Sequence, residues 1–242
     1  MVTADSELIT FAPVPGAGDK TLLRFLQAQA ADLKEAHHEL LNDVASAITE
    51  RGWAQPIDAI ITKLVDQAGL HRERLESALG DLVRRRLLTL DDQRQRVVSL
   101  LGCFSLARSE HRAHLASGID VFTFGGADLL TVNSALVQPV DVFTRCPVTG
   151  RDLKLVIAEE AVVEASPIGI AGFVADWDGA SPLEALSANS PLFASDDAMA
   201  EWVAAHPDVK GTELSADLLL WVGMEGAKRL GALRFKLIGL NV

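Results

Sequence analysis

Ser117 and Asp120 are the residues of this chain whose types and spacing best suit acid–base chemistry. They lie in the stretch "SGIDVFTF", and if that stretch begins a helix, their spacing places the hydroxyl and the carboxylate on one face. Phe122 and Phe124 follow, and burial beside them raises the pKa of a carboxylate, as a proton donor near neutral pH requires. The sequence therefore predicts Asp120 and Ser117 as catalytic and Phe122 and Phe124 as substrate-binding residues. The competing interpretations are that Asp120 caps a helix or is a surface carboxylate.

Two cysteines, Cys103 and Cys146, are the other candidates for chemistry. Cys146 opens the turn "CPVTG", where we interpret it as a small buried residue that also borders the substrate. Cys103 lies in the apolar run "LLGCFSL" and is predicted to belong to the core. The sequence predicts no metal site, unless the fold joins Cys103 and Cys146 into a pair that binds a soft metal.

The first half of the chain, which must support these residues, is patterned as helices. Apolar residues recur at helical spacing over residues 22–48, which predicts two amphipathic helices ending at Gly52. Two further helices are predicted over residues 56–68 and 71–86, and the next segment is patterned as a hairpin that turns at residues 91–92. Together these elements predict a winged-helix-like domain.

The second half is patterned as short strands. The alternating runs "DVFTR" and "LKLVI" predict a mostly antiparallel sheet built around residues 140–175. The halves also differ in formal charge, which is −2 over residues 1–116 and −9 over residues 117–242. We therefore predict an α+β fold with a helical winged-helix-like domain over residues 1–115 and a mixed α/β domain over residues 116–242.

A winged helix raises the alternative of DNA binding. The segment "HRER" would open the second helix of the helix-turn-helix, and "RRR" at residues 84–86 would face phosphates. A domain with a net charge of −2 lacks the basic balance of a DNA-binding surface, so the composition favours a structural module.

Composition predicts an ordinary cytoplasmic protein. The chain has 242 residues, of which 49% are hydrophobic and 23% charged, as in folded globular proteins. Two cysteines and the absence of a basic start with an apolar run argue against secretion. No apolar stretch approaches the roughly 20 residues of a membrane helix, so we expect no membrane association.

Several segments of the second half resemble the organomercurial (alkylmercury) lyases in order. They are "SGID", the turn Cys-x-x-Thr-Gly at Cys146, and "FAS" at residues 193–195 followed by Trp202, His206 and Gly211. The segment "SLARSEH" is similar to another stretch of that family. The resemblance covers the full second half, and it implies a winged-helix-like first domain as well.

The lyase reaction implied by this resemblance needs two thiols that capture the soft metal and one acid that protonates the departing carbon. The family's acid matches Asp120. Its first catalytic cysteine, three residues before the acid, matches Ser117, and the second matches about Ala188, so both thiols are missing. Cys146 matches a third family cysteine, which is structural.

Because the chain resembles the family but lacks both thiols, the resemblance implies a diverged lyase-like enzyme. Such an enzyme would use an Asp as acid or base in a reaction of a small organic substrate, and it would need no cofactor. Two alternatives stay open. One is a DNA-binding regulator whose lyase-like domain senses a ligand, and the other is a true organomercurial lyase or soft-metal binder that uses Cys103 and Cys146. The sequence also leaves a homodimer open.

Overall fold

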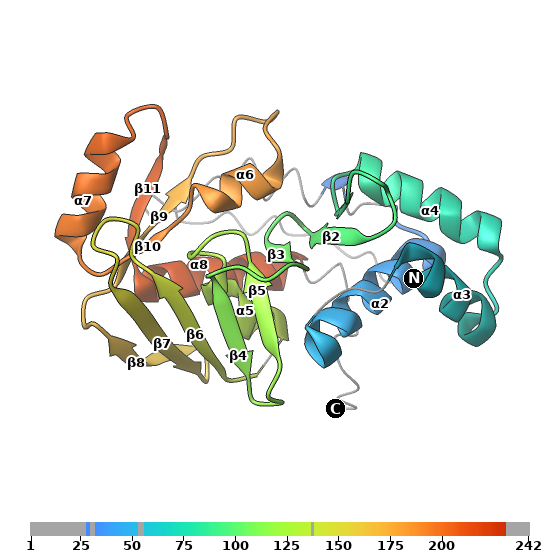
Figure 1. Ribbon diagram of the computed structural model, residues 1–242, viewed down its shortest axis with the longest axis horizontal. Helices are drawn as coiled ribbons and strands as arrows, with labels where there is room; N and C mark the ends of the chain where they lie inside the picture. The colour runs from blue at the N-terminus through green and yellow to red at the C-terminus, as the bar shows by residue number, and fades with distance from the viewer. Residues whose placement is uncertain (1–27, 30–31, 53–55, 137, 231–242) are drawn as a thin grey trace, which may run out of the picture.

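Three helices at one end of the molecule adjoin a long antiparallel sheet covered by further helices, as the computed structural model shows (Figure 1). The structure describes residues 28–29, 32–52, 56–136 and 138–230. The helix expected to begin at Leu22 lies largely outside these residues.

The helices of the first half are α2 (Glu35–Arg51), α3 (Ile57–Ala68) and α4 (Arg72–Arg84). They end as the sequence predicts, because Gly52 and Gly69 follow α2 and α3 with φ of 75° and 65°, a left-handed conformation that glycine adopts without strain. Strands β1 (Leu88–Leu90) and β2 (Val97–Leu100) then form the expected hairpin. The order of elements is that of a winged helix, and the assignment to that fold stays a prediction.

Eight strands form one sheet in the order β1-β2-β3-β5-β4-β6-β7-β8, with every neighbouring pair antiparallel. The remaining strands of this sheet are β3 (Phe104–Ser105), β4 (Arg112–Leu115), β5 (Asp120–Thr123), β6 (Val140–Arg145), β7 (Asp152–Ala158) and β8 (Ala161–Ser166). The mostly antiparallel sheet expected around residues 140–175 is therefore confirmed.

The predicted boundary at residue 115 lies in the connection between two paired strands. Strand β4 ends at Leu115, and it pairs with β5 on one side and β6 on the other. The sheet thus continues through this point, and the division into two domains stays a prediction.

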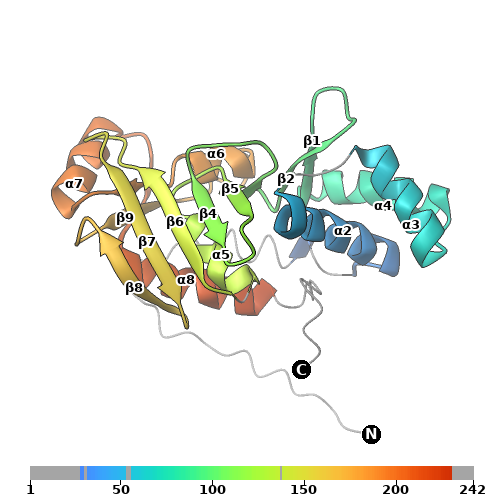
Figure 2. The same ribbon diagram turned by 60° about the horizontal axis from the view of Figure 1, so that its bottom comes forward.

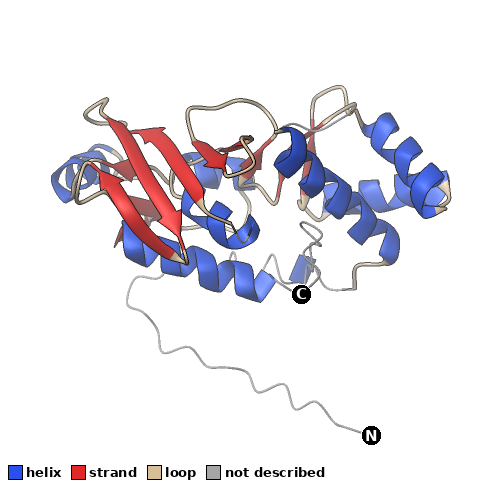
Figure 3. Cartoon of the chain, turned by 90° about the horizontal axis from the view of Figure 1, so that it is seen from below, coloured by secondary structure: helices blue, strands red, loops and turns tan. Residues whose placement is uncertain are grey.

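A second layer covers one face of the long sheet. It contains α5 (Leu129–Leu136) and α8 (Ala216–Leu230), which pack against each other and run along the sheet in Figure 2. A small antiparallel sheet of order β10-β9-β11 adjoins it. Figure 3 shows the longest strands at the end of the molecule away from the three helices of the first half. The other elements are β9 (Ala171–Ala175), α6 (Leu183–Ala188), β10 (Leu192–Phe193), α7 (Asp196–Ala205) and β11 (Gly211–Ser215).

The expected helix at "SGIDVFTF" is wrong. Ser117 lies in the turn of a hairpin, where the Gly118 N–H donates to the Leu115 carbonyl over 2.9 Å, and Asp120 begins strand β5. Val121, Phe122 and Thr123 are buried in succession, which suits a strand in the interior of a sheet. Sheet pairing with β3 and β4 decided the local structure.

Candidate functional site

Asp120 lies at the surface of the sheet in a small network of ion pairs. Its carboxylate lies 2.8 Å from Nδ1 of His114 and 3.3 Å from Nη1 of Arg112, and its side chain is 34% exposed. Partial burial raises the pKa of Asp120, but the hydrogen bond with His114 and the charge of Arg112 outweigh it and leave the pKa below its ordinary value. The expected raised pKa is therefore wrong for this residue.

Ser117 does not share a face with Asp120, because the two residues lie in a hairpin rather than on one helical turn. Ser117 is exposed in the turn. Phe122 is 9% exposed inside the sheet, whereas Phe124 is half-buried after β5. Contacts with a substrate stay a prediction for all four residues.

Cys146 is fully buried in the tight turn after β6. Its N–H donates to the Arg151 carbonyl and its carbonyl accepts from the Gly150 N–H, each over 2.9 Å. Burial raises the pKa of the thiol, but hydrogen bonds from the side chain and backbone of Thr149 outweigh it and lower the pKa below its usual value. These contacts describe a turn residue, and contact with a substrate stays a prediction.

Asp128 is a carboxylic acid that the sequence reasoning missed, and its surroundings differ from those of Asp120. It lies between β5 and α5, after Gly125 and Gly126. Its Oδ2 atom is buried and finds no hydrogen-bond partner among the described residues. Burial raises the pKa of Asp128 to about 7, and hydrogen bonding by the Ser187 side chain and the Gly125 backbone offsets only part of that rise. A carboxyl group in this state is half protonated at neutral pH.

Cys103 lies near Asp128 rather than near Asp120. It follows Leu101 and Gly102, which turn the chain between β2 and β3 with φ of 57° and 72°, and its carbonyl accepts from the Phe124 N–H over 3.1 Å. Burial raises the pKa of the Cys103 thiol well above its usual value, and the negative charges of Asp128 and Glu184 raise it further. The thiol is therefore neutral at neutral pH.

Helix α6 completes this group from a distant part of the sequence. The Ser187 hydroxyl donates to the Gly102 carbonyl over 3.0 Å. The backbone packs equally closely, since a Cβ atom at Gly125 would lie 1.8 Å from the Ser187 carbonyl oxygen. We call Cys103, Gly125, Asp128 and Ser187 the Asp128 cluster. It combines a half-protonated acid, a neutral thiol and a hydroxyl.

Two features of the sequence could have indicated this cluster. The stretch "GGAD" precedes the apolar run of α5, and such a glycine pair marks a close backbone approach. Gly125 also lies three residues before Asp128, which is the spacing expected between the first thiol and the acid. Ser187 adjoins Ala188, where the second thiol was expected. The same pattern therefore fits Asp128, with a glycine and a serine in place of the thiols.

The other motif residues of the second half hold the fold together. Ser195 caps α7 by accepting the Ala198 N–H over 3.3 Å. Trp202 packs against Phe173 and Phe193 and stacks on His206 with 4.2 Å between ring centroids.

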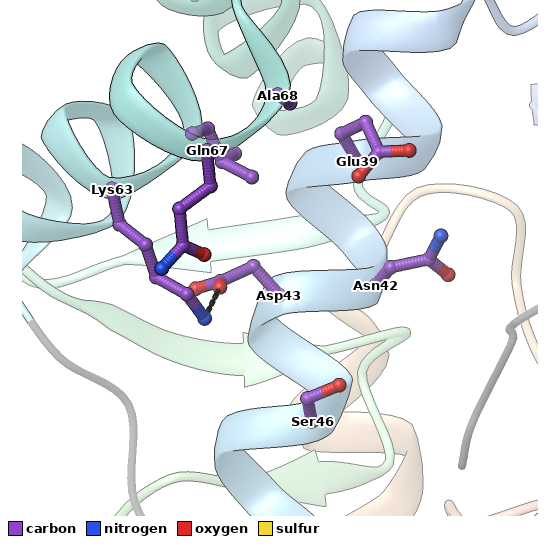
Figure 4. Close-up of a pocket in the computed structure, with 8 residues that line it drawn as sticks. Glu39, Asn42, Asp43, Ser46, Lys63, Gln67 and Ala68 are labelled. Atoms are coloured by element: carbon purple, nitrogen blue, oxygen red, sulfur yellow. Dashed lines mark hydrogen bonds and ion pairs between the residues drawn. The ribbon is translucent and has the colours of Figure 1, made fainter. Parts of the chain in front are cut away.

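Two surface hollows lie away from this cluster, among the helices of the first half. One lies between α2 and α3, where Lys63 pairs with the buried Asp43 (Figure 4). The other lies between α3, α4 and the hairpin and includes Arg72, which pairs with Asp58 over 2.8 Å. In each hollow a basic side chain is thus paired with a carboxylate of the protein.

Two larger features are absent from the residues that the structure describes. Among residues 28–29, 32–52, 56–136 and 138–230, no group of three or more His, Cys, Asp or Glu side chains could hold a metal ion. Within the described part of the chain, none of the helices is long and apolar enough to span a membrane.

Comparisons with known proteins agree with one another. The sequence model of the alkylmercury lyase family, MerB, matches residues 104–225. A solved structure, "Crystal structure of the mercury-bound form of MerB2", superposes with a TM-score of 0.72 at 22% identity, covering 88% of this chain and 100% of that chain. No curated protein matches the sequence.

Proposed function

This chain belongs to the alkylmercury lyase family, and from that premise we propose that it is a diverged member that protonates a carbon atom of a small organic substrate, with Asp128 as the proton donor. The observation that carries the proposal is the buried, unpartnered Oδ2 of Asp128, whose carboxyl has a pKa of about 7. A general acid acts best when its pKa lies near the working pH.

Asp128 suits this role better than Asp120, which the sequence favoured. Asp120 is ionised and already holds His114 and Arg112, so it has neither a proton to give at pH 7 nor a free oxygen. Asp128 has both. The bond between the substrate carbon and a group that leaves without its electron pair, as a carboxylate leaves as CO2, breaks. The electron pair stays on the carbon and takes the proton of the Asp128 carboxyl, and water then restores that proton.

The thiol chemistry of the cluster supports a substrate other than organomercury. Soft metals bind thiolates, whereas Cys103 holds its proton because burial and nearby negative charges raise its pKa. Gly125 and Ser187 supply no thiol. Cys146, the other cysteine of the chain, is enclosed in its own turn.

The proposal is tested by proton delivery from solvent. We expect acetoacetate and related small carbonyl compounds, screened in D2O by NMR, to include one that loses CO2 and gains carbon-bound deuterium faster with the wild type than without protein. Asp128→Asn should lower that rate by about 100-fold or more. Asp120→Asn is the matched control, because it makes the same chemical change at the surface and should leave the rate unchanged. Full activity in Asp128→Asn would refute the assignment.

One observation keeps organomercury as a second candidate, namely the position of Cys103 beside Asp128. Phenylmercuric acetate with excess thiol is the probe, and released benzene is the readout. The diverged function predicts no benzene. Turnover that disappears in Cys103→Ala would establish the organomercurial alternative.

DNA binding by the first half receives little support from the contacts of its arginines. Arg72 pairs with Asp58 and Glu76, whereas Arg84 and Arg85 both pair with Asp81. These side chains have carboxylate partners in place of phosphates. We expect no mobility shift with genomic DNA fragments at physiological salt.

A further inference from the structure

We infer that Ser187 is a positioning residue that orients the acidic proton of Asp128 and links it to the backbone beside Cys103. The inference rests on the proposed role of Asp128 as proton donor. Ser187 is 7% exposed near the end of α6, and the contact between its carbonyl and Gly125 fixes its backbone next to the segment that leads to Asp128.

The direction of the hydrogen bonds follows from the single proton of a hydroxyl group. The Ser187 hydroxyl donates that proton to the Gly102 carbonyl over 3.0 Å. Its oxygen therefore presents only lone pairs to the neighbouring Asp128 carboxyl. A protonated Asp128 can donate to that oxygen, so the proton of the acid has a defined position before the reaction.

Ionisation of Asp128 reverses this arrangement. The carboxylate has no proton to donate, and a hydrogen bond to an ionised acceptor is stronger than one to a neutral carbonyl. The Ser187 hydroxyl then rotates away from the Gly102 carbonyl and donates to Asp128. Ser187 thereby stabilises the carboxylate that remains after proton transfer, in agreement with its lowering effect on the pKa of Asp128.

Two other titratable groups face this arrangement. Cys103 approaches from the turn between β2 and β3, and Glu184 from the first turn of α6. Glu184 accepts a hydrogen bond from the Thr89 hydroxyl. Neither group supplies a positive charge that would stabilise the ionised form of Asp128, so that stabilisation comes from the Ser187 hydroxyl and the Gly125 backbone.

The test is a titration of Asp128 in protein labelled with 13C at aspartate carboxyls, followed by NMR. The wild type should titrate near pH 7, and Ser187→Ala should raise the pKa, because the carboxylate loses its donor. Ser190→Ala is the matched control. Ser190 is equally buried and also bonds to backbone, donating to the Leu186 carbonyl over 3.1 Å, and its loss should leave the pKa of Asp128 unchanged.

The outcomes separate the inference from the proposed function. A wild-type pKa near 4 would remove the proton donor itself. A wild-type pKa near 7 that is unchanged in Ser187→Ala, or that rises equally in Ser190→Ala, overturns only the role of Ser187. If Ser187→Ala does not fold, Ser187→Cys keeps a similar size with a weaker donor, and it should raise the pKa in the same direction by a smaller amount; no shift overturns the inference.

Discussion

Asp120 begins the short strand β5 and Asp128 follows it, and their surroundings give the two acids opposite properties. Asp120 is partly exposed between a histidine and an arginine, which lower its pKa. Asp128 is half-buried beside a thiol and a hydroxyl, with its Oδ2 atom out of contact with water, and burial raises its pKa to about 7. The comparison shows that neighbouring charge decides the state of the first acid, whereas loss of water decides the state of the second.

The largest expected difference between the two acids is in the pH dependence of stability. Because the pKa of Asp128 is raised on folding, its contribution is fully present below pH 4 and is lost as pH rises to about 7. Asp128→Asn removes this loss. Between pH 4 and pH 7, the free energy of unfolding of the variant should therefore rise relative to that of the wild type by up to about 4 kcal/mol. Urea denaturation from pH 4 to pH 8 measures it. A difference independent of pH would place Asp128 in water.

The next effect concerns the close packing that encloses Asp128. Gly125→Ala should destabilise the protein by about 2 to 3 kcal/mol, because its Cβ would lie 1.8 Å from the Ser187 carbonyl oxygen. Gly80→Ala in α4 is the control, because a Cβ there meets nothing within 4 Å and alanine stabilises a helix by about 0.5 to 1 kcal/mol. Thermal unfolding compares them. An equal change in stability for the two variants would show that α6 does not pack closely against Gly125.

A smaller effect should appear in the reactivity of Cys103. The charge of Asp128 raises the pKa of this thiol, so Asp128→Asn should increase the rate of alkylation by iodoacetamide at pH 8 several-fold. Asp120→Asn should leave the rate unchanged. Mass spectrometry of peptides distinguishes Cys103 from Cys146. An identical rate in both variants would show that the thiol and Asp128 are not neighbours.

The smallest effect is expected at the surface acid. Asp120→Asn should cost less than about 1 kcal/mol at pH 7, because its ion pairs with Arg112 and His114 are exposed. Since the pKa of Asp120 is lowered on folding, this contribution is present above its unfolded pKa and disappears as pH falls below it. Denaturation at pH 7 and pH 2.5 checks the sign. A loss of several kcal/mol would make Asp120 a structural anchor.

The sequence by itself determined the helices after residue 56, the hairpin that follows, the antiparallel strands around residues 140–175 and the resemblance to the lyase family. These features depend on local periodicity, on glycines at chain turns and on motif order, all of which are visible in one dimension. The strand at Asp120 was missed because four residues carry little periodic signal, and pairing with β3 and β4 fixes their conformation.

Only the tertiary structure decided which acid has a carboxyl oxygen out of contact with water. The pKa of a carboxyl group depends on its exposure to water and on nearby groups. The groups beside Asp128 come from the turn at Cys103 and from α6, far away in the sequence. The adjoining phenylalanines suggested burial for Asp120, but Asp120 is the first residue of β5 and follows the hairpin turn directly. Its carboxylate therefore lies with Arg112 and His114 at the surface, while Asp128 is covered by the chain that returns through Ser187.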